Sequence, residues 1–530
     1  MRSFISISLI LASTLLNRLG LGVVHAQSSV TISTTSGNLR GVEQDGVMSF
    51  KGIRFAEAPS GLLRWEPPVP FVSSAAQDAT VLSPSCFQQF AFATANLTEL
   101  LFNNPQDPPV ESEDCLFLNV WAPSPASSTK KPVVFWIYGG SLAFGTASIP
   151  AYDGTSIALN QDIVVVTINY RTNVFGFPGA PDLPLTANNL GFLDQELALE
   201  WVKLNIANFG GDPDQITIMG QSAGGFSVSG MVIRHPVDPP FRAAIIFSGA
   251  SPDTTPTSAA SFTSFNNFAS AVGCGEIAGL SRLACLREVS AEDIRAYTNG
   301  PSSGAFEPVI DDTTTFDDNI QRIQAGNAAR VPLLAGNMQN DGTLFTVGDT
   351  NLTAFLEASG FTGIDANITA AVVRSLYPGQ NDTDVIADTF RDVVFLCPTS
   401  LWTAAFVESG ISSVFRYEYG AVFPDLQLFP NAGAWHSTEL PELFGTFNAS
   451  TATPNEVTLS KTFQTAIANF IKDPNESPAP NWPKYIPGSL TQTLARLAYN
   501  GNVETDNFVQ AVTSDSQDTP CVLWDVLLDF

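Results

Sequence analysis

The sequence predicts an α/β protein built on a large, mostly parallel sheet with helices on both faces. Short runs rich in valine, isoleucine and aromatic residues alternate with stretches of helical pattern. Each run is apolar throughout, which is typical of parallel strands that are buried on both faces by helices. With 44% hydrophobic residues in a chain of 530, there is enough apolar material for a large core.

Four runs carry the strand pattern, at residues 132–138, 162–169, 215–219 and 243–247. Between the second and third runs, residues 193–209 have apolar side chains at helical spacing and stop at Gly210-Gly211, which predicts a helix. A further strand is expected over residues 331–340. The polar stretches between elements are too short for interdomain linkers and no repeat is found, so residues 27–530 are expected to form one large domain with insertions.

The first 26 residues have the pattern of a secretory signal peptide. Arg2 precedes an apolar run over residues 4–16, and small residues lead up to Ala26, where cleavage is expected. The run is too short to span a membrane; a buried N-terminal helix is the alternative interpretation. Export agrees with six potential glycosylation sequons, at Asn96, Asn351, Asn367, Asn381, Asn448 and Asn475. The protein is therefore expected to be secreted and extracellular, with no integral membrane segment.

Charge and histidine content exclude several functions. The chain has 51 acidic and 24 basic residues, a net charge of −27, which repels phosphate backbones and argues against nucleic-acid binding. Only His25, His235 and His436 are present, so a multi-histidine metal site is disfavoured. No metal or organic cofactor is expected.

The pattern Gly-x-Ser-x-Gly occurs twice and is weak evidence by itself. Ser222 follows the predicted strand 215–219 and precedes helix-compatible residues, which is the strand–turn–helix setting of a nucleophile elbow. Ser302 has no strand before it and a proline beside it. We therefore expect Ser222 to be a nucleophile and Ser302 to be an ordinary loop residue.

A serine nucleophile needs a general base, which is normally a histidine held by an acid. His235 lies 13 residues beyond Ser222, near the end of the helix that Ser222 would begin, and is interpreted as a surface or cap residue. His436 lies among small residues in loop-like sequence. Although a single histidine is often structural, His436 is the expected base.

The expected acid is Asp341, which follows the predicted strand 331–340. Open α/β sheets place their active sites at the carboxyl ends of strands. Asp341 also lies in a favourable Asn-Asp-Gly turn, and the two interpretations are compatible. Glu439 is a weaker alternative because it is too close to His436 in sequence to hold the ring from outside.

Backbone donors for an oxyanion are expected where strand 132–138 ends. Gly139-Gly140-Ser141 follows this strand, and glycines there suit N–H groups that point into a cavity. Together with the N–H of Ala223, this loop would form an oxyanion hole. A plain turn is the alternative.

Export also makes the six cysteines candidates for disulfides. Six cysteines allow 15 pairings, and sequence alone does not choose among them. Proximity along the chain hints at pairs among the first four cysteines, and the last two would then tie the C-terminus to the rest of the chain. The six are Cys86, Cys115, Cys274, Cys285, Cys397 and Cys521. No Cys-x-x-Cys pair supports a metal site.

Taken together, these motifs resemble the secreted type-B carboxylesterase/lipase family of the α/β-hydrolase fold, which includes fungal lipases and cholinesterases. The resemblance covers almost the whole mature chain, through the elbow, the His436 segment and further blocks at residues 52–56, 64–65, 113–119, 169–171, 191–195 and 208–213. It implies Ser222 as the nucleophile, His436 as the base, and Gly140, Ser141 and Ala223 as oxyanion donors. It also implies the disulfides Cys86–Cys115, Cys274–Cys285 and Cys397–Cys521.

The chain departs from the family pattern at three positions. Asp341 stands where the family usually has Glu, Ser141 replaces the third glycine of the oxyanion loop, and Gln221 replaces a common Glu before the nucleophile. Losing that negative charge should weaken attraction for cationic substrates.

The loop between Cys86 and Cys115 contains no tryptophan. In cholinesterases a tryptophan in this loop supplies the aromatic face that binds choline, so cholinesterase activity is not expected. The loop instead has four phenylalanines, which suggest an apolar wall or lid, although core packing explains some of them equally well: Phe87, Phe90, Phe92 and Phe102.

The sequence therefore predicts a secreted serine ester hydrolase with a Ser-His-Asp triad and an acyl-enzyme, acting on uncharged, fairly apolar small-molecule or lipid esters. Two alternatives stay open. One is an interfacial triacylglycerol lipase, and the other is a non-catalytic adhesion or binding protein related to cholinesterases.

Overall fold

The computed structural model describes residues 27–91, 94–124, 129–251, 262–275, 277–361, 365–488, 490–503 and 507–528. The predicted signal peptide and Phe92 lie outside these residues.

Within the described residues, 13 strands form one mixed sheet in the order β1-β2-β3-β5-β7-β6-β8-β9-β10-β11-β12-β13, with β4 paired to β2. The pairs from β7 through β6, β8, β9, β10 and β11 to β12 are parallel. Along this order the pairs on either side of them are antiparallel, so parallel strands form the centre of the sheet, and β4 pairs with β2 in parallel at the edge. The strands are β1 Ser28–Thr34, β2 Gly37–Gln44, β3 Val47–Arg54, β4 Ala76–Asp78, β5 Phe117–Pro123, β6 Lys131–Ile137, β7 Val164–Ile168, β8 Gly211–Gln221, β9 Ala243–Phe247, β10 Leu333–Met338, β11 Val414–Tyr419, β12 Leu494–Leu497 and β13 Val509–Val512.

The helices lie between the strands and in long insertions. They are α2 Ala95–Phe102, α3 Thr155–Gln161, α4 Asn173–Gly176, α5 Leu190–Asn205, α6 Ala223–Arg234, α7 Thr263–Ala271, α8 Leu280–Glu288, α9 Ala291–Thr298, α10 Asn319–Gln324, α11 Leu352–Ser359, α12 Ala366–Leu376, α13 Asp382–Arg391, α14 Cys397–Glu408, α15 Glu439–Phe444, α16 Pro454–Lys472, α17 Asp515–Asp518 and α18 Cys521–Leu528. A π-helical segment, Asp392–Leu396, joins α13 to α14.

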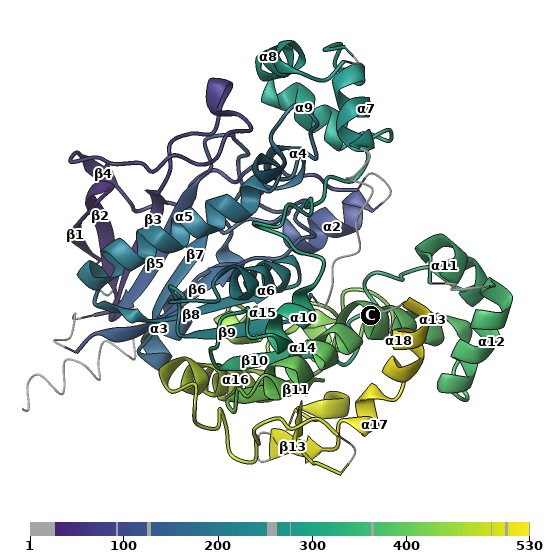
Figure 1. The fold of residues 1–530 in the computed structure, drawn as a ribbon. Helices are drawn as coiled ribbons and strands as arrows, with labels where there is room; N and C mark the ends of the chain where they lie inside the picture. The colour runs from purple at the N-terminus through teal and green to yellow at the C-terminus, as the bar shows by residue number, and fades with distance from the viewer. Residues whose placement is uncertain are drawn as a thin grey trace, which may run out of the picture.

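Helices cover both faces of the sheet, as the apolar runs predict (Figure 1). In β6 the side chains of Val133, Phe135 and Ile137 join one buried core, which α5, α6 and α14 complete. Val134 and Trp136 point the other way and pack in a second core with α3 and α16. Alternate strand residues face opposite sides of a sheet, so a run that is apolar at every position needs both layers. The predicted α/β class is confirmed.

Element boundaries differ from the predictions where backbone contacts extend or shorten a pattern. β9 has the predicted bounds, whereas β8 begins at Gly211 because that residue pairs with Lys131 beyond an irregularity in the ladder. The predicted helix 193–209 is α5 followed by a 3₁₀ turn, Ile206–Phe209, which ends at Gly210 with φ 86°. β10 ends early, at Met338, because its backbone N–H donates to the Asp341 carboxylate within a turn.

Two helical insertions lie outside the central layers. Figure 1 shows α7, α8 and α9 gathered at the top of the view, and α11, α12, α13 and α18 gathered at its right-hand side. A disulfide is associated with each group, Cys274–Cys285 at the first and Cys397–Cys521 at the second. Each group has a small apolar core of its own.

One helical stretch of the described residues, Asp382–Glu408, is long and apolar enough to pass a simple test for a membrane span. It consists of α13, the π-helical segment and α14, and 61% of its most apolar window is buried inside the protein. Packing against the sheet explains this apolar composition.

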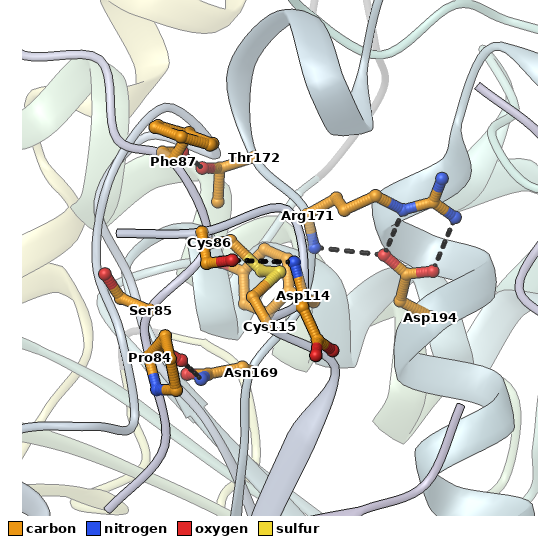
Figure 2. Close-up of a disulfide and its surroundings, with 12 residues drawn as sticks. Pro84, Ser85, Cys86, Phe87, Asp114, Cys115, Asn169, Arg171, Thr172 and Asp194 are labelled. Atoms are coloured by element: carbon orange, nitrogen blue, oxygen red, sulfur yellow. Dashed lines mark hydrogen bonds and ion pairs between the residues drawn. A yellow bond between two sulfur atoms is a disulfide. The ribbon is translucent and has the colours of Figure 1, made fainter. Parts of the chain in front are cut away.

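The third disulfide, Cys86–Cys115, lies beside a group of buried polar contacts (Figure 2). The Arg171 guanidinium forms a two-pronged ion pair with Asp194 at the start of α5. The neighbouring Thr172 hydroxyl donates to the carbonyl of Phe87, directly after Cys86. Both partners of the ion pair are nearly inaccessible. The ion pair of Arg171 and the hydrogen bond of Thr172 together anchor this segment beside the disulfide. The three disulfides are the pairs that the family resemblance implies.

Candidate active site

Ser222 occupies the sharp turn between β8 and α6. Its backbone has φ 56° and ψ −126°, a conformation that is unfavourable for a non-glycine residue. The glycines on either side are sterically required. A Cβ at Gly220 would lie 2.3 Å from the Gly224 carbonyl oxygen, and one at Gly224 would lie 2.0 Å from that of Ile137. The strand–turn–helix setting predicted for Ser222 is therefore present.

Asp341 lies in the turn after β10 and is completely buried. Its Oδ2 accepts hydrogen bonds from the backbone N–H of Met338, at 2.7 Å, and from the hydroxyl of Ser248, at 2.8 Å. Its Oδ1 lies 2.8 Å from Nδ1 of His436. Sequence reasoning did not identify Ser248. Its position directly after β9 was a usable signal, because neighbouring parallel strands end at the same edge of the sheet.

The His436 ring is 3% exposed and is packed between aromatic side chains. Phe395 stacks on it with ring centroids 4.6 Å apart, and Phe345 meets it edge-on at 5.0 Å. Phe395 belongs to the π-helical segment, and such segments are frequent at functional sites. Neither phenylalanine is predicted from the sequence, since neither lies in a motif.

Ser222 and His436 line the same cavity, but no hydrogen bond between their side chains is found among the described residues. Instead, Nε2 of His436 lies 3.1 Å from Nε2 of Gln221. The structure thus joins Asp341 to His436 directly and places Ser222 at the same cavity without a bond to the ring. Apo structures of hydrolases often show such looser contacts at the nucleophile.

The loop predicted to supply oxyanion donors also lines this cavity, through Gly139, Gly140 and Ser141. Gly140 has φ 110°, and a Cβ there would lie 2.3 Å from the carbonyl oxygen of Phe144. Ser141 has φ 55°, in the left-handed region that favours glycine. The serine at this position therefore holds a glycine-like backbone. Ala223 begins α6 directly after Ser222.

The walls of the cavity are mainly apolar. The apolar and aromatic side chains that line it are Phe102, Phe144, Ile149, Tyr152, Leu344 and Phe345. Of the phenylalanines in the Cys86–Cys115 loop, Phe102 reaches the cavity, as a wall would require. Phe87 stacks on Phe175 in a separate core, and Phe90 is buried against Phe144. The loop thus contributes both to the wall of the cavity and to core packing.

Glu439, three residues after His436, is also completely buried, and neither of its carboxyl oxygens has a hydrogen-bond partner among the described residues. Burial, and then the nearby charge of Asp341, raise the pKa of Glu439 to about 8. Glu439 therefore carries a proton at neutral pH. It does not contact the ring, so Asp341 is the carboxylate positioned to orient His436.

The alternative residues lie elsewhere. His235 caps α6 and forms a hydrogen bond of 2.9 Å with Glu196, as expected for a cap residue. Ser302 lies in a turn after α9. All six sequon asparagines are exposed.

Comparison with known proteins gives consistent results. The model of the carboxylesterase family matches residues 26–515. The para-nitrobenzyl esterase of Bacillus subtilis is 33% identical over 473 residues, covering 86% of this chain and 92% of that protein. The chlorogenic acid esterase of Aspergillus niger is 32% identical, covering 84% and 83%. Secreted lipase 5 of Gibberella zeae is 30% identical, covering 90% and 92%. The solved structure of a PNB esterase superposes with a TM-score of 0.75 at 29% identity, covering 94% of this chain and 100% of that one.

Proposed function

Because the chain belongs to the carboxylesterase family, whose members hydrolyse carboxylic esters, we propose that Ser222, His436 and Asp341 are its catalytic triad. The observation that supports this most is the 2.8 Å contact between Asp341 and His436 at the cavity that Ser222 also lines. The proposed substrates are uncharged, fairly apolar esters.

The proposed reaction has two halves. Ser222 attacks the ester carbonyl while Nε2 of His436 takes the hydroxyl proton, and Asp341 stabilises the resulting imidazolium. The backbone N–H groups of Gly140, Ser141 and Ala223 stabilise the tetrahedral oxyanion. His436 then gives its proton to the departing alcohol, which leaves an acyl ester on Ser222. In the second half, His436 takes a proton from water, which attacks this ester. The acid then leaves as His436 returns the proton to Ser222.

The substrate preference rests on the walls of the cavity. Apolar and aromatic side chains dominate them, and Gln221 adds no negative charge beside the nucleophile. Phe102 reaches the cavity from the disulfide loop where choline recognition would need a tryptophan face. These features favour a neutral acyl or alcohol group over a cationic one.

The test compares Ser222→Ala with the wild type on 4-nitrophenyl butyrate. Loss of the nucleophile should reduce kcat by about 10⁴-fold or more. Ser302→Ala is the matched control, since it removes the serine of the second Gly-x-Ser-x-Gly pattern and should leave kcat unchanged. Equal rates for the wild type and Ser222→Ala would refute the triad and would favour a non-catalytic binding protein.

An interfacial lipase is the second candidate. Phe345 lines the cavity and is nevertheless 41% exposed, so an apolar side chain is available to a lipid surface. Rates on butyrate and oleate esters, each measured with and without an emulsion, distinguish an interfacial lipase from an esterase for dissolved substrates. A jump in the oleate rate at the interface would identify a lipase, and a higher rate on dissolved butyrate would identify an esterase.

Secretion is part of the same proposal. Three disulfides form from all six cysteines, as expected for an oxidising compartment. The six exposed sequon asparagines are accessible to a glycosylating enzyme. The mature protein, expressed in a secreting host, should begin at Gln27 and lose mass on treatment with a glycosidase that removes N-linked glycans.

A further inference from the structure

Both ring nitrogens of His436 have a partner, and neither partner is Ser222. Nδ1 lies 2.8 Å from Asp341, and Nε2 lies 3.1 Å from the side-chain nitrogen of Gln221. Gln221 is the last residue of β8 and is 2% exposed. Gln221, the residue before the proposed nucleophile, is thus hydrogen-bonded to Nε2, the nitrogen that must accept the proton of Ser222.

The surrounding hydrogen bonds determine which atoms carry hydrogen. The carboxylate of Asp341 only accepts: Oδ2 accepts from Met338 and Ser248, so Oδ1 accepts from the N–H at Nδ1 of His436. A neutral imidazole with its hydrogen on Nδ1 has a bare lone pair on Nε2. The amide group of Gln221 therefore donates an N–H to Nε2.

The other end of the Gln221 side chain lies against the loop of oxyanion donors. A Cβ on Gly139 would come within 3.0 Å of Oε1 of Gln221 and within 2.8 Å of Cβ of Ser222. Gly139 therefore leaves the space that the glutamine needs. The amide extends from this loop to the His436 ring, so Gly139 on one side and the ring on the other determine its position.

Among the described residues around the ring, no second negative charge offsets this neutral amide. Glu439 carries its proton at neutral pH, because burial and then Asp341 raise its pKa to about 8. Tyr152 lines the cavity, and burial is the main cause that raises its pKa well above the usual value. Both groups are therefore uncharged, and Asp341 is the charged group in contact with the ring.

The elements packed on the two faces of the ring do not alter this balance. Phe345 and Phe395 contribute aromatic rings to these faces. The π-helical segment that supplies Phe395 also includes Asp392, which pairs with the adjacent Arg391. Arg391, the last residue of α13, also pairs with Asp388, and no contact between Asp392 and the His436 ring is found among the described residues.

We propose that Gln221 is a positioning residue for ester hydrolysis: its amide holds the uncharged imidazole of His436 in the free enzyme and yields Nε2 to the Ser222 hydroxyl when substrate binds. This inference rests on the proposed function, since it assigns Gln221 a task toward the proposed base. A neutral donor favours the neutral ring, whereas a carboxylate at the same position favours the imidazolium. The identity of residue 221 should therefore set the lower pH limit of activity.

The first test is the pH dependence of kcat/KM for 4-nitrophenyl butyrate in Gln221→Glu and Gln221→Met. Gln221→Glu should move the acid limb to higher pH by about one unit or more, because a carboxylate would lie within ion-pair distance of the ring. Gln221→Met keeps the side-chain length but loses the donor, and should move the limb in the same direction by less. Gln321→Glu adds the same charge at an exposed position of α10 and should leave the limb in place. Acid limbs of both Gln221 variants that coincide with that of the wild type would overturn the proposal.

The second test needs neither substrate nor turnover. The chain beyond residue 26 contains two histidines, His235 and His436, so their imidazole NMR signals can be followed in Ser222→Ala. Adding Gln221→Glu, or Gln221→Met if the first does not fold, should move the titration of His436 to higher pH and leave that of His235 unchanged. An unmoved His436 titration would refute the role of Gln221. Failure of the triad itself would be seen separately, as retained activity in Ser222→Ala.

Discussion

Asn340 and Trp435 pair across an isolated parallel β-bridge, and the next residue in each segment is a member of the proposed triad. The backbone N–H of Asn340 donates to the Ala434 carbonyl at 3.1 Å, and the N–H of Ala434 donates to Oδ1 of Asn340 at 3.0 Å. These bonds set the register in which Asp341 meets His436. The contact between acid and base thus depends on backbone alignment as well as on their own side chains.

Removal of the Asn340 side chain should therefore impair catalysis without removing a proposed triad residue. Asn340→Ala is expected to lower kcat by about 10- to 100-fold, since displacements near 1 Å at an active site have effects of this size. Asn208→Ala removes an asparagine bonded to a backbone carbonyl at an exposed site and is the matched control. A kcat for Asn340→Ala equal to that of the control would show that the bridge does not align the acid and the base.

The assignment of the acid can be tested by two amide substitutions. Asp341→Asn keeps the size of the side chain but replaces the charged acceptor at Nδ1, and should lower kcat by about 10⁴-fold. Glu439→Gln should leave kcat within a few-fold of the wild type, because Glu439 is already neutral and does not bond to the ring. A larger loss in Glu439→Gln than in Asp341→Asn would reverse the assignment.

Stability should depend on pH through Glu442, which is completely buried in α15 with both oxygens unpartnered among the described residues. Burial, and then the charges of Glu456 and Asp425, raise its pKa to about 9. From the ordinary pKa of glutamate up to about 9, the folded state binds more protons than the unfolded state, so the unfolding free energy falls as pH rises. The slope is at most about 1.4 kcal/mol per pH unit for one group.

Glu442→Gln should remove this contribution. Its Tm should approach that of the wild type at acid pH and exceed it increasingly up to pH of about 9, as measured by calorimetry across the range. Glu476→Gln changes an exposed glutamate and is the control. A Tm difference that stays constant with pH would contradict the buried, protonated state of Glu442.

The disulfides should differ in their contribution to stability. Cys397–Cys521 closes a segment with a sequence separation of 124 residues, whereas Cys274–Cys285 spans 11. Loop-closure entropy then predicts a larger loss for Cys397→Ser/Cys521→Ser, of about 4 to 5 kcal/mol, than for the other pair, of about 3 kcal/mol. Denaturant unfolding of both double variants measures the order. The opposite order would mean that native-state contacts dominate over chain entropy.

Some features of the site follow from short stretches of sequence. The elbow at Ser222 is visible because a strand, two sterically required glycines and a helix follow one another within a few residues. Asp341 is visible for a similar reason, since a polar turn follows an apolar strand. His436 is identified by scarcity, because few histidines exist to serve as a base.

Other features involve residues that no motif marks. Ser248 binds the far oxygen of Asp341, and Phe395 packs on His436 from a π-helical segment. Each is local in space but distant along the chain. The phenylalanines of the disulfide loop illustrate the same limit, since composition does not distinguish Phe102, which lines the cavity, from Phe87, which packs in a core.

The amino-acid sequence by itself determined the alternation of buried strands and helices, the position of the sharp turn at Ser222 and the choice of chemistry, because each depends on neighbouring residues. Only the tertiary structure decided which groups meet. His436 lies 95 residues from Asp341 and 215 from Gln221, yet it bonds to both. Such contacts depend on the order and register of strands in the sheet, so they emerge only when the whole core is packed.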